Sequence, residues 1–135
     1  MVSSVEISRP ELVAFLQTLG AKPDPNHIYD GHIIRNPAHI YVVLDREGID
    51  EDDVEIFTQK LGSIPRTSIV IDISRAEGSE QLAVEIVGKF AACWPVIVDN
   101  CLPEEIGGKV FTADELLELK TSGKGFWPQY AQVGP

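Results

Sequence analysis

The fold of this chain follows from residues Thr67 to Asn100, TSIVIDISRAEGSEQLAVEIVGKFAACWPVIVDN. The stretch begins with a run rich in β-branched residues, Thr67 to Ser74, and ends with a second such run, Val96 to Asp99. Apolar residues between them recur at the spacing of one helix face, after a predicted N-cap at Ser79 and before a stop at Trp94-Pro95. This pattern predicts strand, helix and strand, with the first strand covered on both faces at the centre of a parallel sheet.

The residues before this stretch predict two more helices and a β-hairpin. Ser8-Arg9-Pro10-Glu11 has the form of a capping box, in which the serine hydroxyl and the glutamate side chain satisfy backbone groups at a helix start. Two extended runs joined at Asn36-Pro37 predict a hairpin, whose second strand covers residues 39–45. Asp50 is the predicted N-cap of a second helix, which is expected to end at Gly62.

The residues after this stretch predict one short strand and one short helix. An edge strand, antiparallel to its predecessor, is predicted from Lys109 to Phe111. Thr112 opens a second capping box and a helix that runs through Lys120. Residues 121–135 lack periodicity and predict an irregular tail. Its aromatic residues form either a patch folded back on the body, which we favour, or an exposed partner-binding element; they are Phe126, Trp127 and Tyr130.

Together these elements predict one α/β domain over residues 1–135. We expect three layers: a mixed sheet of about five strands with a parallel centre and an N-terminal hairpin, covered by about four helices. No apolar run approaches the roughly 20 residues of a membrane span, and the N-terminal residues lack the features of a secretory signal. A cytoplasmic location without a membrane partner is therefore expected, and the sequence does not predict an oligomeric state.

The charge of the chain favours a basic partner. There are 21 Asp and Glu against 11 Lys and Arg, a formal net charge of −10, which repels nucleic-acid phosphates and anionic membranes. Helix initiation explains part of this acidity, since the helix dipole favours carboxylates in a first turn. We predict a partner-binding surface where the acidic residues concentrate, formed by Asp45, Glu47, Asp50, Glu51, Asp52, Asp53 and Glu55.

A catalytic alternative rests on aspartates near the ends of predicted strands. Asp45, Asp72 and Asp99 are each 27 residues from the next. The crevice at the carboxyl ends of parallel strands is the usual ligand site, and carboxylates there can hold magnesium for phosphoryl transfer. The alternative is a small enzyme or nucleotide-type ligand binder that uses these three residues with Ser74 and Arg75, and its catalytic candidates are Asp72, Arg75 and Asp99. In the structural interpretation, aspartates at strand ends satisfy loop amides.

The loop between the predicted central strand and its helix is a candidate anion site. Ser74, Gly78 and Ser79 offer hydroxyls and free amides at a helix start, where Arg75 is placed to pair with an anion. The loop lacks the glycine and lysine spacing of the phosphate-binding and dinucleotide-binding motifs. In the structural interpretation, Arg75 pairs with a glutamate of the same segment and Gly78 allows the turn.

Histidines and cysteines form no recognisable metal motif. His27, His32 and His39 fall in the predicted hairpin, where two of them could meet from neighbouring strands, but local hydrogen bonding is the favoured interpretation. No cysteine or carboxylate lies at a spacing that completes a tetrahedral set, so neither a metal nor a cofactor is predicted. Cys93 and Cys101 are expected to be reduced and largely buried thiols.

Three segments of the second half of the chain resemble a group of small bacterial proteins. They are IDISRAEGS at residues 71–79, AACWPVIVDN at residues 91–100 and GKVFTADEL at residues 108–116. The chain from Thr67 to Leu119 is similar to uncharacterised single-domain proteins, some of them from toxin and immunity loci. The resemblance implies a small cytoplasmic protein that covers the active site of a toxin. We therefore predict a non-enzymatic binding protein, an immunity-type inhibitor whose acidic surface binds a basic toxin such as a nuclease.

Overall fold

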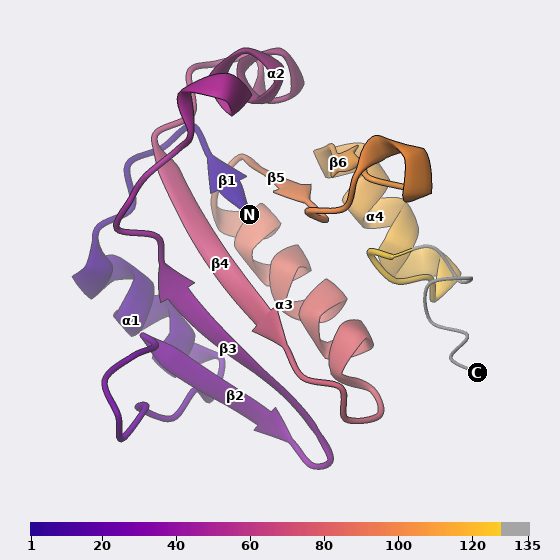
Figure 1. Cartoon of the computed structure of the whole chain (residues 1–135). Coiled ribbons are helices and arrows are strands. Elements are labelled where there is room, and N and C mark those ends of the chain that lie inside the picture. The colour runs from indigo at the N-terminus through magenta and orange to yellow at the C-terminus, as the bar shows by residue number, and fades with distance from the viewer. Residues whose placement is uncertain (128–135) are drawn as a thin grey trace.

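A sheet of six strands organises the described part of the chain (Figure 1). The structure is a computed structural model and describes residues 1–127. Every pair of neighbouring strands in the order β2-β3-β4-β1-β5-β6 is antiparallel. The strands are β1 (Val2–Ser3), β2 (Gly31–Arg35), β3 (Ala38–Leu44), β4 (Thr67–Ile73), β5 (Val96–Asp99) and β6 (Val110–Phe111).

The prediction of five strands with a parallel centre is wrong, because a two-residue N-terminal strand enters the sheet. β4 and β5 run in the same direction, as expected for a strand, helix and strand unit. However, β1 lies between them and is antiparallel to both. Val2 and Ser3 are too few to show a hydrophobic period, so the sequence pattern does not reveal this strand. The α/β class, the four α-helices and the hairpin of β2 and β3 are confirmed within residues 1–127.

The second departure concerns β3 and β4, which are antiparallel although a helix connects them. That helix, α2 (Glu51–Leu61), lies beyond the ends of the two strands in Figure 1 instead of running back along the sheet. Because the chain leaves β3 and enters β4 at the same end of the sheet, the two strands run in opposite directions. A helix between two strands therefore does not by itself establish parallel pairing.

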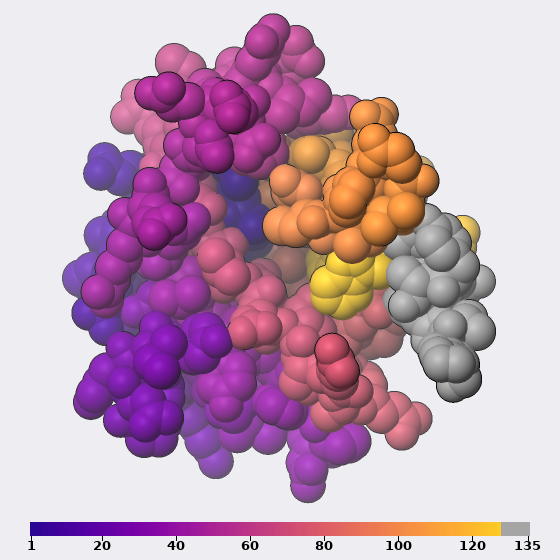
Figure 2. Space-filling model, viewed as in Figure 1, coloured from indigo at the N-terminus to yellow at the C-terminus, as the bar shows by residue number. Residues whose placement is uncertain are grey.

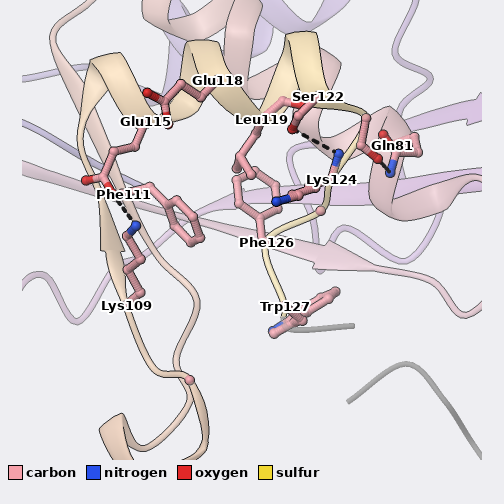
Figure 3. Close-up of a pocket in the computed structure, with 13 residues that line it drawn as sticks. Gln81, Lys109, Phe111, Glu115, Glu118, Leu119, Ser122, Lys124, Phe126 and Trp127 are labelled. Carbon is pink, nitrogen blue, oxygen red and sulfur yellow. Dashed lines mark hydrogen bonds and ion pairs between the residues drawn. The ribbon is translucent and has the colours of Figure 1, made fainter. Parts of the chain in front are cut away.

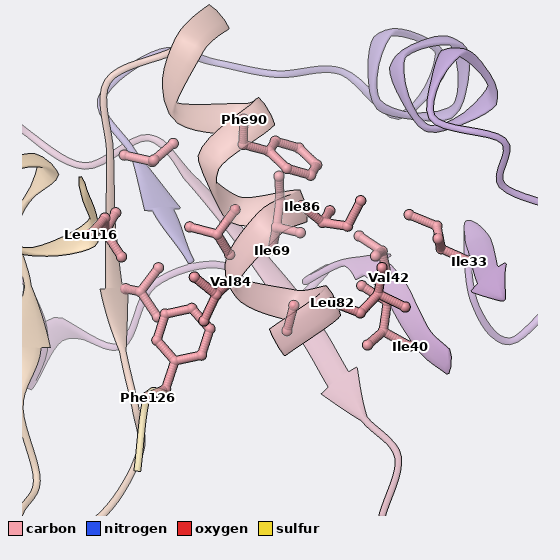
Figure 4. Packing of buried hydrophobic residues seen from close by; sticks show 14 of the residues in the cluster. Ile33, Ile40, Val42, Ile69, Leu82, Val84, Ile86, Phe90, Leu116 and Phe126 are labelled. Atoms are coloured by element: carbon pink, nitrogen blue, oxygen red, sulfur yellow. The ribbon is translucent and has the colours of Figure 1, made fainter. Parts of the chain in front are cut away.

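The main hydrophobic core lies between the sheet and three helices, α1 (Arg9–Thr18), α3 (Ser79–Cys93) and α4 (Ala113–Ser122). Phe90 of α3 is fully buried and makes an edge contact with Phe15 of α1, with ring centroids 4.8 Å apart. Figure 4 shows Ile86 of α3 packed towards Val42 of β3. Complete burial of one such side chain contributes about 1.5–3 kcal/mol. Because α3 buries seven residues and α1 and α4 bury two each, α3 is the main anchor of the sheet.

The opposite face of the sheet is covered at one end, by α2. There Phe57 packs against Val2 of β1 and Ile97 of β5. Away from α2, Val70 of β4 is 45% exposed. The prediction that β4 is covered on both faces is therefore wrong. The second helical layer in the described part of the chain is thus α2 alone, and much of this sheet face is open.

Local signals set the helix starts in most cases. The two predicted capping boxes and the Asp50 cap are present. The predicted N-cap at Ser79 is wrong, because Gly78 occupies that position with a φ of 84°. The Ser79 hydroxyl instead accepts a hydrogen bond from His39 N at 3.0 Å, which ties the start of α3 to the hairpin.

The segment after α4 folds back on the body as far as it is described. Phe126 is 4% exposed and contacts Phe111, with ring centroids 5.7 Å apart. Trp127 Nε1 donates a hydrogen bond to Asn100 O at 3.2 Å. The folded-back alternative is therefore confirmed for these two aromatic residues, whereas Tyr130 lies outside the described residues.

The sequence also led to predictions about the two cysteines and about membrane-spanning helices. Cys93, at the end of α3, and Cys101, in the loop after β5, are free and exposed, so the prediction of buried thiols is wrong. Both lie where an element ends, and neither packs into the core. Among the helices of residues 1–127, none has the length and apolar character needed to cross a bilayer.

Candidate functional site

The open face of the sheet contains a cavity of about 610 Å³, which we call the central cavity. It lies beside α2, where the N-terminal residues, β4 and the end of β5 meet. Figure 2 shows it as a hollow with N-terminal residues at its base, between α2 and the loop that follows β5. Five acidic residues line it: Asp45, Glu47, Asp50, Asp53 and Asp99.

Two short loops and one helix start hold these carboxylates in place. Asp45 Oδ1 accepts a hydrogen bond from Glu47 N at 3.0 Å, and Asp99 Oδ1 accepts one from Cys101 N at 2.9 Å. Asp50 caps α2, which places Asp53 in the first turn of that helix. Each capping bond fixes the direction of a side chain while engaging one of its two carboxylate oxygens, so capping and ligand binding are compatible.

Within residues 1–127, no ion pair balances the negative charge of the central cavity. The ion pairs among residues 1–127 join other side chains, and none includes a carboxylate of this cavity. Burial, followed by repulsion from Asp50 and Asp99, raises the pKa of Asp53 above its ordinary value. Burial also lowers the pKa of the Met1 amino group to about 6, which leaves it mostly uncharged at neutral pH. A cation entering the cavity would therefore relieve repulsion that already exists.

Apolar side chains form much of the remaining wall. Val2 and Phe57 belong to the small cluster under α2, and Val70 presents its exposed surface on β4. Trp127 contributes from the C-terminal side. An apolar wall with acidic groups above it suits a lysine or arginine side chain, whose methylene stem is apolar and whose head is cationic.

The structure brings together part of the predicted partner-binding surface. Asp45, Glu47, Asp50 and Asp53 line the central cavity, whereas Glu51, Asp52 and Glu55 are exposed on α2 outside it. Sequence analysis did not assign Asp99, Val70 or Trp127 to this surface. Asp99 was marked as a site residue only by its strand-end position, and Trp127 only as part of the aromatic tail, whereas no local pattern marks Val70.

The residues of the catalytic alternative are dispersed. Asp45 and Asp99 line the central cavity, but Asp72, Ser74 and Arg75 do not. Asp72 Oδ2 accepts a hydrogen bond from Tyr29 OH at 2.8 Å on another part of the sheet.

The polar groups of the candidate anion loop bond mainly to each other and to the hairpin. The hydroxyls of Ser74 and Ser79 are 2.7 Å apart, and Ser79 is 1% exposed. Gly78 takes the left-handed conformation that the turn requires, and Arg75 is exposed. The buried Ser79 hydroxyl therefore serves the junction between α3 and the hairpin, as described above.

Two of the three histidines meet, as the hairpin permits. His32 Nε2 lies 3.1 Å from His39 Nδ1, and His32 stacks on Tyr41 with ring centroids 4.0 Å apart. Burial and the neighbouring His39 lower the pKa of His32. Through residue 127 no three His, Cys, Asp or Glu side chains are grouped so that they could hold a metal ion.

A second cavity, of about 590 Å³, lies between β6, α4 and the segment that leads to Trp127 (Figure 3). Lys109 and Glu115 form an ion pair on its wall, and Phe111 and Phe126 lie beside them. Lys109 lowers the pKa of Glu115 through their hydrogen bond. Glu118 and Lys124 also line this cavity, so its two lysines and two glutamates balance in number. The central cavity differs, because its described lining has five acidic residues and no lysine or arginine.

Comparisons with known proteins give no family for this chain. No family model matches it, and neither the curated proteins nor the solved structures contain a match. Function must therefore be argued from the site.

Proposed function

We propose that this protein is a non-enzymatic binding protein whose central cavity receives lysine or arginine side chains of a basic partner protein. The observation that carries the proposal is the convergence of Asp45, Asp50, Asp53 and Asp99 around one apolar-walled cavity, with no ion pair to any of them in residues 1–127. The overall charge of −10 acts in the same direction, because it attracts a basic partner from a distance.

An immunity-type inhibitor of a basic toxin, such as a nuclease, is the particular form of this proposal. Such an inhibitor must bind fast and hold tightly. Complementary charge accelerates association, while apolar and aromatic side chains in a desolvated centre supply most of the affinity. The central cavity combines both kinds of group, with aspartates beside Val70 and Trp127.

Charge-neutral variants test the proposal without removing the caps. The triple variant Asp50→Asn, Asp53→Asn, Asp99→Asn keeps the side-chain oxygens that accept the capping bonds, since asparagine is an equally good N-cap. A matched control removes the same charge from exposed acids elsewhere, with Glu6→Gln, Glu77→Gln and Asp114→Asn.

The measurement is binding of the basic protein that co-purifies with the wild-type chain, once that protein has been purified. We expect the site variant to lose most of the affinity and the control to keep it. The wild-type association rate should fall as salt is raised. Equal losses in the two variants, or the absence of any basic partner, would contradict the proposal.

A further inference from the structure

Two histidines meet on one face of the hairpin formed by β2 and β3. His32 lies opposite Tyr41 in the strand register, and His39 lies two positions before Tyr41, so the two imidazoles are diagonal neighbours. His39 and Tyr41 alternate with the buried Ile40 and Val42, so this face points away from the main core. Neither histidine lines the central cavity, and the pair is therefore a separate candidate site.

The facing ring nitrogens are separated like two ligands of one metal ion. Metal–imidazole bonds of about 2.0–2.1 Å place neighbouring ligand atoms about 2.9 Å apart at a right angle and about 3.4 Å apart at a tetrahedral angle. The distance of 3.1 Å from His32 Nε2 to His39 Nδ1 lies within this range. Burial and the neighbouring His39 lower the pKa of His32, so its ring is mostly neutral at pH 7 and has a lone pair to offer.

The backbone of each histidine is held from outside the hairpin. His32 exchanges two hydrogen bonds with Lys22, at 2.8 and 2.9 Å. His39 N donates to the Ser79 hydroxyl at 3.0 Å, and His39 O accepts from Ser74 N at 3.3 Å. Because both strands are fixed on their far sides, the spacing of the two histidines is set before any ligand binds. A ligand that uses both rings therefore binds without reorganising the backbone.

Aromatic neighbours hold the imidazole rings in place. His32 stacks on Tyr41 with ring centroids 4.0 Å apart and an angle of 8° between the planes. Tyr41 in turn packs against Tyr29, whose hydroxyl donates to Asp72 Oδ2 at 2.8 Å. A supporting shell of this kind orients metal ligands, and the Asp72 carboxylate adds negative charge to the same face. The net charge of −10 also attracts cations to the protein.

We propose that His32 and His39 together bind one divalent transition-metal ion of the group Zn²⁺, Ni²⁺ and Cu²⁺, for which imidazole is a preferred ligand. Within residues 1–127 no third His, Cys, Asp or Glu joins the pair, so water completes the coordination and the ion is exchangeable. In the metal-free protein one facing nitrogen carries a proton. On metal binding this proton moves to the other nitrogen of its ring. The ion joins β2, at the edge of the sheet, to β3 and stabilises the hairpin (Figure 1).

Calorimetry on the full chain, prepared without an affinity tag and stripped of metal, tests the site with Zn²⁺ as the probe. We expect one saturable Zn²⁺ per chain, tighter binding of Cu²⁺, and no comparable binding of Mg²⁺, which prefers oxygen ligands. His32→Gln and His39→Gln should each lower the Zn²⁺ affinity at least tenfold. The matched control is the exposed His27, replaced by asparagine because its φ is 56°, and this variant should bind Zn²⁺ as the wild type does.

NMR of the wild-type chain gives a readout that does not depend on how the variants fold. Zn²⁺ should shift the ¹⁵N signals of His32 Nε2 and His39 Nδ1 and leave those of His27 in place. A loss of affinity smaller than tenfold in either histidine variant would overturn the proposal, as would the absence of saturable Zn²⁺ and Cu²⁺ binding. Loss of Zn²⁺ binding in the triple aspartate variant would also overturn it, because the ion would then lie in the central cavity. None of these outcomes depends on a basic partner.

Discussion

Replacing Asn100 with aspartate tests how the wall of the central cavity is held. Asn100 is 7% exposed, and its Nδ2 donates to Gly107 O and Phe126 O, each at 3.0 Å. Its Oδ1 accepts from Lys109 N at 2.9 Å and from Leu102 N at 3.3 Å. One side chain thus connects the end of β5, the loop before β6 and the segment after α4.

The magnitude follows from the two donors that aspartate lacks. Asn100→Asp preserves shape and keeps the acceptor, but it leaves one buried and one partly buried carbonyl group without their partner. Each such loss costs about 1–2 kcal/mol, which gives about 2–4 kcal/mol for the pair. A new carboxylate next to Asp99 adds repulsion in the same direction.

Urea unfolding at pH 7, followed by circular dichroism, measures the loss. Asn26→Asp is the matched control because Asn26 is exposed in a loop, where the same change should cost less than about 0.5 kcal/mol. Below about pH 4 the introduced carboxyl becomes protonated and can donate again, so the loss should shrink. A loss under about 1 kcal/mol for Asn100→Asp at pH 7 would refute the assigned role.

Three further predictions concern stability. Gly88→Ala should stabilise the protein by about 0.5–1 kcal/mol in thermal unfolding, because Gly88 lies inside α3 with open space at its Cβ position. Asp53→Asn should raise the free energy of unfolding at pH 7 in low salt, because the raised pKa of Asp53 means that folding disfavours the ionised carboxylate. The gain should vanish at low pH, where Asp53 is protonated, and a less stable variant at pH 7 would contradict the prediction. Glu115→Gln should lower the free energy of unfolding at pH 7, because the hydrogen bond from Lys109 lowers the pKa of Glu115. This stabilisation is present above about pH 4.5 and is lost as the pH falls through the pKa of Glu115 in the folded state. Wild type and variant should therefore have the same stability in acid.

Several elements could be predicted from sequence because their signals are local. The capping boxes at Ser8 and Thr112 identify helix starts through contacts within four residues. The same holds for Asp50 and for the hairpin turn at Asn36-Pro37. Ser79 shows the limit of this reasoning, because its hydroxyl bonds a residue 40 positions away in the sequence and leaves the cap position to its neighbour.

The candidate site was predicted only in part, because some of its residues are distant in the sequence and meet only in the folded chain. The acidic run from Asp45 to Glu55 is visible in the sequence, and about half of it lines the central cavity. Asp99 joins that run because β5 ends beside α2, a proximity that no spacing reveals. The 27-residue interval between aspartates led to a catalytic alternative, but Asp72 lies within β4 and bonds Tyr29 away from the cavity.

By itself, the sequence determined the four helices of the described chain, the N-caps of three of them, the strong strands and the net negative charge. These depend on residues close together in the chain. Tertiary structure alone decided the strand order. β4 and β5 run in the same direction, but β1 lies between them and is antiparallel to both, so every neighbouring pair in the sheet is antiparallel. The central cavity likewise arises where the N-terminal residues, β4 and the end of β5 meet, and these segments are neighbours only in the folded protein.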